Sequence, residues 1–413
     1  MIIPLIAIAA VFVLIAIRQV GNVRIPMWVA MSLGAAAVLA TGQISIPAAI
    51  SAINFQVIFL LLGMFLIGEG LRQSNYLVNL FYNSFEGIQS KSELLLVIIF
   101  GEGIISAFIV NDPFVIIATP LIMTVSRKHN IDYKPLLLAL AFSVTIGSAM
   151  SPIGNPQNIL IAASGAISTP LVKFFQYLLI PTLISLYVVY LAIRFFFKGH
   201  FSGNVDITEK ERIADKELAT LCKFSLSVFI VLIAVNVAIE LFTHGPGIPL
   251  GDIGLVSALP MFILSKRRFE LAKGVNWSIL IFFASMFILV QSVWSTGFFQ
   301  SLITQFGLNL SQPGPIFVIS LVVSQFISNV PLVALYLPIL SSLGAKAISY
   351  LALAAASTIA GNLYVLGAAS NIIIIDESEK KYGKTITPVE FSKIGIVVTL
   401  ASALVYYLFI YVL

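Results

Sequence analysis

The chain has 413 residues, of which 59% are hydrophobic and only 10% are charged, and its formal net charge is +5. Soluble domains carry about 25% charged residues, so this composition leaves too little polar surface to coat a soluble globule and indicates an integral membrane protein. The single cysteine, Cys222, falls in what we expect to be a charged loop and excludes a disulfide framework, an iron–sulfur centre and a multi-thiolate metal site.

Apolar stretches long enough to cross a bilayer recur along the whole chain. We expect ten spans, near residues 2–18, 26–42, 53–71, 135–164, 172–197, 224–242, 250–265, 275–293, 347–375 and 388–412. Amphipathic stretches are expected at 75–88 and 297–309, and a polar linker at 199–222. The first apolar run has no basic region before it, so we expect no cleavable signal peptide.

Two further apolar stretches, 93–125 and 313–342, share a pattern at a constant offset of 218 positions. The shared residues are Ser106, Asn111 and Pro113 in the first stretch and Ser324, Asn329 and Pro331 in the second. Proline removes an amide donor and disfavours helix at the residue before it, so each stretch is expected to break and form a re-entrant hairpin. Broken apolar helices in corresponding positions of two halves indicate the substrate site of a secondary transporter.

A second pair of breaks follows the hairpins. Gly154 and Asn158 correspond to Gly367 and Asn371 at an offset of 213. The first break has two prolines and two glycines between Gly147 and Asn158, so it cannot be continuous helix, and we expect it to complete an ion site beside the first hairpin. The second break has no proline, and a helix that is only kinked at its glycines is the alternative.

The repeat and the charges together predict an inverted topology. Residues 1–198 and 223–413 each hold five spans, an odd number, so the second repeat must be inserted upside down. With both termini outside, 21 of the 23 basic residues fall on the inner side, and only Lys173 and Lys346 fall outside. This asymmetry follows the positive-inside rule and predicts that the linker at 199–222 is cytoplasmic. The basic residues are therefore expected to set the membrane topology and not to bind nucleic acid.

The hairpin tips carry oxygen-rich side chains without positive charge. Backbone groups that are exposed near mid-membrane are tolerated where they line a cavity or bind a ligand. Neutral oxygen clusters suit a hard cation such as Na⁺, and the amide ends of the outgoing helices suit an anion. The alternative is that the asparagine and serine residues only cap helices. Asp112 is the one acid at a tip and, like Glu102, could carry a proton or cap a helix.

At these residues the chain resembles the ion transporter superfamily of divalent anion–sodium symporters, arsenite permeases and NhaD-type antiporters. Ser328-Asn329-Val330 keeps two letters of the Ser-Asn-Thr tip of the symporters, whereas Asn111-Asp112 with Thr119-Pro120 is more similar to arsenite permeases. The resemblance implies an elevator mechanism, a scaffold and a transport domain, and a homodimer. It also implies two sodium sites, formed by Ser106, Asn111 and Gly154 and by Ser324, Asn329 and Gly367.

These features predict an all-α, multi-pass protein of the cell membrane that moves a small anion by Na⁺ or H⁺ coupling. The residues expected to bind substrate are Asn111, Asp112, Pro113, Asn155, Asn158, Ser328, Asn329, Ser370 and Asn371. An arsenite-type efflux permease, an Na⁺/H⁺ antiporter and a passive channel stay open as alternatives. No catalytic constellation, nucleotide motif or bound cofactor is expected.

Overall fold

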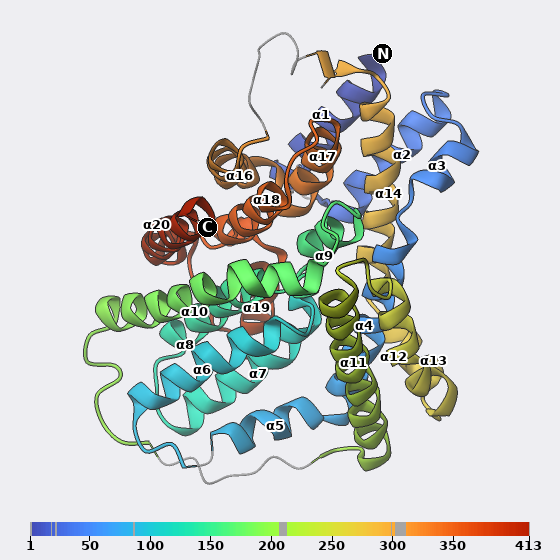
Figure 1. The fold of residues 1–413 in the computed structure, drawn as a ribbon. Helices are drawn as coiled ribbons and strands as arrows, with labels where there is room; N and C mark the ends of the chain where they lie inside the picture. The colour runs from blue at the N-terminus through green and yellow to red at the C-terminus, as the bar shows by residue number, and fades with distance from the viewer. Residues whose placement is uncertain are drawn as a thin grey trace.

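The computed structural model describes residues 2–17, 19–20, 23–85, 87–205, 213–298, 300–301 and 311–412. The described part is almost entirely helical (Figure 1). The first half contains α1 (Ile2–Ile17), α2 (Met27–Ala40), α3 (Ile46–Ala52), α4 (Phe55–Ser74), α5 (Tyr76–Ser84), α6 (Lys91–Ser106), α7 (Asn111–Lys128), α8 (Tyr133–Gly147), α9 (Pro156–Ala163) and α10 (Pro170–Phe196). A short antiparallel pair, β1 (Gln19–Val20) and β2 (Val23–Arg24), joins α1 to α2.

The second half follows the same order. It contains α11 (Lys216–Thr243), α12 (Leu250–Leu264), α13 (Arg268–Gly274), α14 (Trp277–Trp294), α16 (Pro313–Ile327), α17 (Asn329–Ser342), α18 (Ala347–Ala360), α19 (Ala369–Tyr382) and α20 (Pro388–Val412). Among the described residues, six helices are long and apolar enough to cross a membrane, and six shorter apolar helices accompany them. The amphipathic stretch expected at 297–309 lies mostly outside the described residues.

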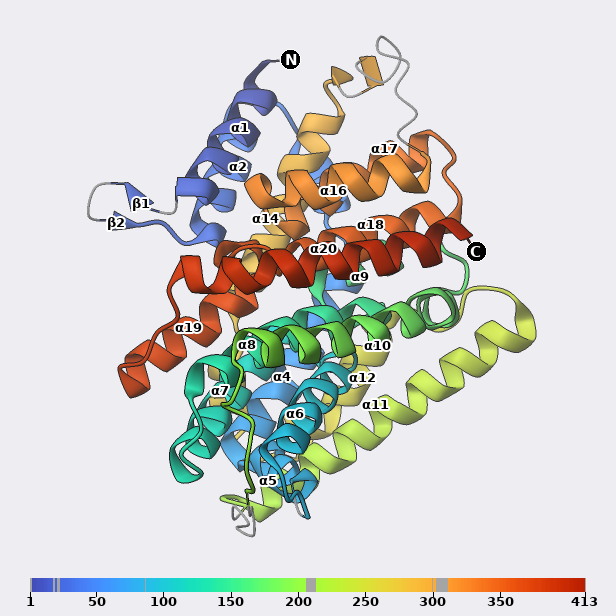
Figure 2. The same ribbon diagram turned by 90° about the vertical axis from the view of Figure 1, so that its left-hand side faces the viewer.

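The helices pack in two groups. In one group α4 packs on α11, α12 and α13, and α14 packs on α1 and α2. In the other, α8 packs on α6, α7 and α10, while α18 packs on α16, α17 and α20. Figure 1 shows the first group along the right-hand side of the molecule, and Figure 2 shows α10 and α20 running side by side in the second.

The expectation that Cys222 lies in a charged loop is wrong. The charged run continues into α11 through Lys216 and Glu217, and the carboxylate of Asp215 accepts a hydrogen bond from the amide of Leu218 at 3.0 Å and caps this helix. Acidic residues at the start of a helix are stabilised by its unpaired amides, so this part of the run begins a helix. Cys222 is therefore buried in α11, close to Gly70 of α4, where an added Cβ would lie 2.9 Å from the sulfur.

Candidate functional site

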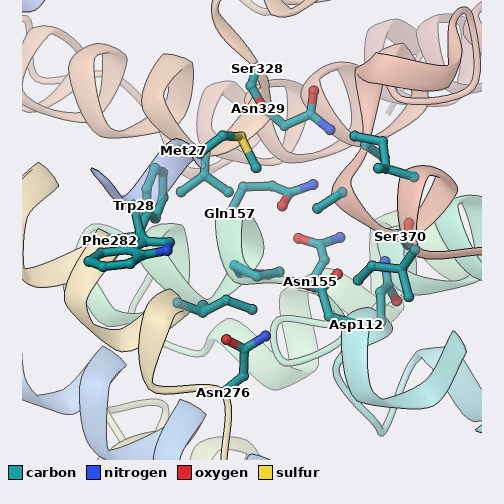
Figure 3. A pocket seen from close by; sticks show the side chains of 18 of the residues that line it. Met27, Trp28, Asp112, Asn155, Gln157, Asn276, Phe282, Ser328, Asn329 and Ser370 are labelled. Carbon is teal, nitrogen blue, oxygen red and sulfur yellow. The ribbon is translucent and has the colours of Figure 1, made fainter. Parts of the chain in front are cut away.

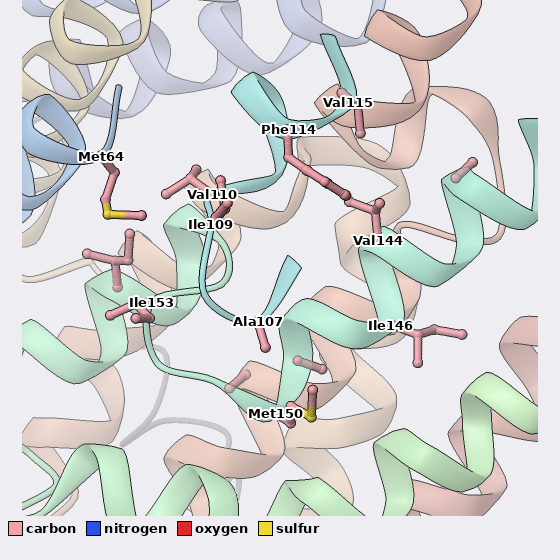
Figure 4. Packing of buried hydrophobic residues seen from close by; sticks show 14 of the residues in the cluster. Met64, Ala107, Ile109, Val110, Phe114, Val115, Val144, Ile146, Met150 and Ile153 are labelled. Atoms are coloured by element: carbon pink, nitrogen blue, oxygen red, sulfur yellow. The ribbon is translucent and has the colours of Figure 1, made fainter. Parts of the chain in front are cut away.

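Both helix breaks expected at the Asn-x-Pro motifs are present. The first helix ends at Ser106 and the next begins at Asn111, while in the second half only Ser328 separates Ile327 from Asn329. Pro113 and Pro331 thus stand in the first turn of α7 and α17, where a missing amide hydrogen costs no helical hydrogen bond. Of the four residues that connect α6 to α7, Ala107, Ile109 and Val110 are buried and Phe108 is exposed. Figure 4 shows Ile109 and Val110 near Met64, Ile153 and Phe114.

Ser328 has a backbone conformation that side chains rarely adopt. Its φ is +67° and its ψ is 158°. This region is almost reserved for glycine, and a residue with a side chain there costs about 1–3 kcal/mol. Strain of this kind persists where the surrounding structure fixes it, and it gathers at ligand sites and switch regions. It makes the tip between α16 and α17 a candidate for ligand contact.

The second pair of breaks is also present, and here too the helices stop. The chain leaves α8 through a 3-10 turn at Ser148–Met150 and restarts at Pro156, and it leaves α18 at Ala360 and restarts at Ala369 after a 3-10 turn at Val365–Gly367. The second break is therefore an interruption and more than a glycine kink. Because each break frees backbone carbonyls in an apolar interior, polar side chains are needed to satisfy them.

Two equivalent asparagines satisfy equivalent carbonyls. Asn158 donates from its side-chain nitrogen to the carbonyl oxygens of Ser148 at 3.2 Å and Ser151 at 2.9 Å. Asn371 donates in the same way to the carbonyl oxygen of Gly361 at 2.8 Å. Ser148 and Gly361 are related by the same offset as the two asparagines (361 − 148 = 213 and 371 − 158 = 213). The two breaks thus have the same internal hydrogen bond.

The tips at the two Asn-x-Pro motifs, before α7 and before α17, dock on these breaks. The side-chain nitrogen of Asn111 donates to the hydroxyl of Ser148 at 3.2 Å. In the second half, a Cβ added to Gly361 would lie 3.3 Å from the side-chain nitrogen of Asn329, so that asparagine lies beside the equivalent residue.

The two glycines of the predicted ion sites allow neighbouring backbone carbonyl groups to approach closely. A Cβ on Gly154 would lie 2.7 Å from the carbonyl oxygen of Ser148 and 2.9 Å from that of Ser106. On Gly367 a Cβ would lie 3.1 Å from the carbonyl oxygen of Gly361. Real Cβ atoms almost never come within 3.0 Å of another atom, so Gly154 in particular leaves no room for a side chain. The structure therefore gathers Ser106, Asn111 and Gly154 around Ser148.

A cavity of about 370 Å³ lies between the two tips and the two breaks (Figure 3). Six of the predicted substrate residues line it, namely Asn111, Asp112, Asn155, Ser328, Asn329 and Ser370. The opposite wall comes from the other helix group, and Figure 3 shows Met27, Trp28 and Phe282 there. The cavity is therefore polar on the side of the breaks and mostly apolar on the side of α2 and α14, where Asn276 and Ser278 are the polar lining residues.

Hydrogen bonds tie the two halves of the chain together at the cavity. Asn155 donates to the hydroxyls of Ser148 at 3.0 Å and Thr358 at 3.2 Å, and Gln157 donates to the same threonine hydroxyl at 3.2 Å. The sequence prediction missed Thr145 and Thr358, which both line the cavity. Their offset (358 − 145 = 213) is that of Gly154 and Gly367, so the repeat could have identified them.

Several buried oxygens around the tips have no hydrogen-bond partner. They are the side-chain carbonyl oxygens of Asn111, Asn158, Asn329 and Asn371 and the hydroxyl of Ser324. Ser106 donates its proton to the carbonyl of Gly103 at 2.8 Å, which leaves its oxygen free to accept. An unpaired buried acceptor is costly, and neutral carbonyl and hydroxyl oxygens are the ligands of hard monovalent cations. The donor set at both tips therefore fits Na⁺.

Of the described residues that line the cavity, Asp112 alone is ionisable, and none is basic. It is buried in the first turn of α7, where the helix dipole favours negative charge. Glu102 does not line the cavity. It is fully buried in α6, one helical turn before Ser106, and neither of its carboxylate oxygens has a hydrogen-bond partner.

The remaining predicted residues lie around the cavity. Asn158 and Asn371 stand behind it, where they hold the breaks. Pro113 contacts Gly68 of α4 and lines a second cavity of about 260 Å³. This second cavity has two ion pairs on its walls, one from Arg72 to Glu69 at 2.6 Å and one from Lys381 to Glu377 at 2.5 Å. Asn276 lines both cavities, so they adjoin.

Comparison with known proteins identifies the family and the fold of the chain. The sequence model of a family described as citrate transporter matches residues 11–351. A 46 kDa membrane protein of Mycobacterium leprae is 30% identical, covering 85% of this chain and 84% of the relative. The silicon efflux transporter LSI3 of Oryza sativa is 23% identical, covering 84% of each chain. The crystal structure of the Alcanivorax borkumensis YdaH transporter shares the fold, with a TM-score of 0.60 at 12% identity over 99% of this chain and 96% of that one.

Proposed function

The chain belongs to the citrate transporter family and is therefore a multi-pass membrane transporter and not an enzyme, and we propose that it moves a small anion or oxyanion by secondary active transport coupled to Na⁺. The observation that carries the proposal is the pair of equivalent tips with unpaired buried oxygens, Asn111 in the first half and Asn329 in the second. Each tip lies beside a helix break and offers ligands to one cation.

The two sodium sites are Ser106, Asn111 and Gly154, and Ser324, Asn329 and Gly367. The glycines contribute backbone carbonyl oxygens and leave room for neighbouring backbone to approach. The asparagines and serines contribute side-chain oxygens. Bound cations and the amide ends of α7 and α17 would then supply the positive potential that an anion needs, because no basic side chain is found among the described residues that line the cavity.

Inverted repeats explain why the motifs recur. Besides the tips and breaks, α10 and α20 share Thr-Leu-x-Ser at Thr182–Ser185 and Thr399–Ser402 (399 − 182 = 217), and these hydroxyl residues are buried in both helices. We therefore expect two repeats of opposite orientation, re-entrant hairpins, both termini outside and a cytoplasmic linker.

The two helix groups support an elevator mechanism. The group of α6 to α10 and α16 to α20 holds nearly all the polar residues of the cavity and would move as the transport domain, while the group of α1 to α4 and α11 to α14 would stay as the scaffold and form a homodimer. The second cavity lies between elements of both groups, α4 and α7 among them, as a passage to one side of the membrane would.

An arsenite-type efflux permease or an Na⁺/H⁺ antiporter is the second candidate. Asp112 favours it, because this carboxyl lines the cavity beside Asn111 and has no basic partner there. A carboxyl in a membrane interior is a natural proton carrier. The relative from Oryza sativa, a silicon efflux transporter, supports a small oxyacid and outward transport.

The experiment is transport into proteoliposomes under an imposed Na⁺ gradient. Candidate anions, starting with citrate and the oxyacids arsenite and silicate, are first screened for thermal stabilisation with and without Na⁺, since a ligand stabilises in proportion to the logarithm of its concentration over Kd. Accumulation against the anion gradient that collapses when Na⁺ is equal on both sides supports the proposal. Flux that only dissipates the anion gradient, whatever the Na⁺ gradient, would establish a passive channel.

A further inference from the structure

The two basic residues that break the charge asymmetry of the chain meet in one groove. Lys173 and Lys346 are 173 positions apart in sequence, yet both line a groove of about 1260 Å³. Its walls are the first turns of α10, α16 and α18 and the C-terminal end of α20. In Figure 2 the C-terminal end of α20 lies near the start of α18, at one end of the second helix group.

The groove is positively charged. Among the described residues, no acidic side chain lines it and neither lysine forms an ion pair. Lys173 donates to the side-chain oxygen of Gln176 at 3.2 Å and lies over the ring of Tyr177 at 5.5 Å, whereas Lys346 is exposed. The nearby Glu240 belongs to α11, is buried, and accepts from the amide of Val172 outside the groove.

Two helix N-termini add positive potential, whereas the C-terminal end of α20 has the opposite partial charge. The first residues of α16 and α18 lie in the groove, and no side chain caps the N-terminus of either helix. The free amides of a helix N-terminus carry partial positive charge. Since two prolines, Pro313 and Pro315, leave α16 with few free amides, α18 is the main contributor beside Lys346.

Tyrosines and apolar side chains complete the groove. Tyr407 and Tyr411 stack at 5.6 Å between ring centroids, Tyr177 lies under Lys173, and Val318 and Ile410 also line the groove. Tyrosine with lysine at the ends of membrane helices is the pattern of the membrane–water interface. A ligand that fits has a negatively charged group for the lysines and an acyl or glycerol portion for the apolar wall.

We propose that this groove binds the phosphate headgroup of an anionic phospholipid. The phosphate lies between Lys173 and Lys346, at the N-terminus of α18, and the glycerol and acyl portions lie along Val318 and Ile410. Basic pockets between membrane helices bind anionic headgroups in this way. The groove shares no lining residue with the cavity at the tips, so the lipid is a separate ligand from the transported solute. A lipid here would tie α10, α16, α18 and α20 together.

The test is the thermal unfolding midpoint of the full-length protein in detergent, titrated with dioleoyl phosphatidylglycerol. Dioleoyl phosphatidylcholine and free glycerol phosphate are titrated in parallel. We expect phosphatidylglycerol to raise the midpoint saturably and the two other probes to have little effect. In Lys173→Gln/Lys346→Gln the apparent affinity should fall by at least about fivefold for each lysine removed, and Lys173→Arg/Lys346→Arg should restore it.

The matched control is Lys198→Gln, since Lys198 also lies over an aromatic ring, that of Phe195 at 4.8 Å, near the far end of α10. It should respond to phosphatidylglycerol like the unmodified protein. Native mass spectrometry of retained lipid gives a second readout that does not depend on stability. Equal responses of the double variant and the unmodified protein, or an equal effect of phosphatidylcholine or glycerol phosphate, would overturn the proposal.

Discussion

The side-chain nitrogen of Asn155 donates to the hydroxyl of Thr358 at 3.2 Å, across 203 positions of sequence. The donor follows the break after α8 and the acceptor precedes the break after α18, so this bond joins the two breaks at the cavity. Gln157 uses the same hydroxyl. The geometry of the cavity therefore depends on one hydroxyl of the second half that accepts from two amides of the first half.

Replacing Thr358 with valine should loosen this junction. The substitution keeps the shape and leaves two buried amide donors without that acceptor, and an unsatisfied buried donor costs about 1–3 kcal/mol. We expect a lower unfolding midpoint and weaker substrate binding. Thr145→Val is the matched control for stability, because Thr145 also lines the cavity but bonds the carbonyl of Ala141 in its own helix. Equal losses in both variants would contradict the role of Thr358.

Gly154→Ala should damage the first cation site. Its Cβ would lie 2.7 Å from one backbone carbonyl oxygen and 2.9 Å from another, and neither can move freely. Overpacking of this kind costs about 1–3 kcal/mol, and the shift would separate Asn111 from Ser148. We expect Na⁺-dependent stabilisation to fall while any ligand effect at the second tip persists.

Gly101→Ala is the control for that substitution, since nothing lies within 4 Å of an added Cβ there and alanine favours helix by up to about 1 kcal/mol. The protein should keep or gain stability and keep its response to Na⁺. If Gly154→Ala behaves like Gly101→Ala, the close packing of Gly154 is not needed for the cation site.

Asp112→Asn separates proton coupling from sodium coupling. Asp112 is the one ionisable group among the lining residues that the structure describes. The variant should therefore lose any pH dependence of flux that arises at the cavity, and it should keep the Na⁺ dependence. Flux is measured in proteoliposomes at several pH values with the anion found by the stability screen. Glu102 lies outside the cavity, so Glu102→Gln serves as the control. If the flux of Asp112→Asn still depends on pH, this residue is not the proton carrier.

Removing Arg72 alone should cost more than removing its whole ion pair. Arg72→Gln leaves the carboxylate of Glu69, whose side chain is 8% exposed, without its charged partner. Breaking a buried pair on one side is costly, whereas replacing both partners is often neutral. Unfolding midpoints should therefore drop for Arg72→Gln and recover in Arg72→Gln/Glu69→Gln. In the other pair the carboxylate of Glu377 is more exposed, at 22%, so Lys381→Gln should lower the midpoint less than Arg72→Gln.

Much of this arrangement could be predicted from the sequence because it rests on local rules. Proline and asparagine at fixed spacing mark where helices stop, and the constant offsets relate Asn111 to Asn329 and Gly154 to Gly367. The contacts of Thr358 and the apolar wall at Trp28 could not be predicted in this way, since they depend on how helices far apart in sequence pack. The start of α11 could not be predicted for another reason. Its first turn is as charged as a solvated loop, and the hydrogen bond that Asp215 accepts shows that a helix begins there.

Binding of Na⁺ at the two tips is tested by comparing the unfolding midpoint in NaCl with that in KCl at equal ionic strength. The midpoint is recorded for the unmodified protein, Asn111→Ala, Asn329→Ala and the double variant, and the Na⁺-minus-K⁺ difference is compared so that stability losses common to both salts cancel. The account predicts a positive difference that is reduced in each single variant and absent in the double variant. A zero difference in the unmodified protein, or an equal difference in all four proteins, would contradict it.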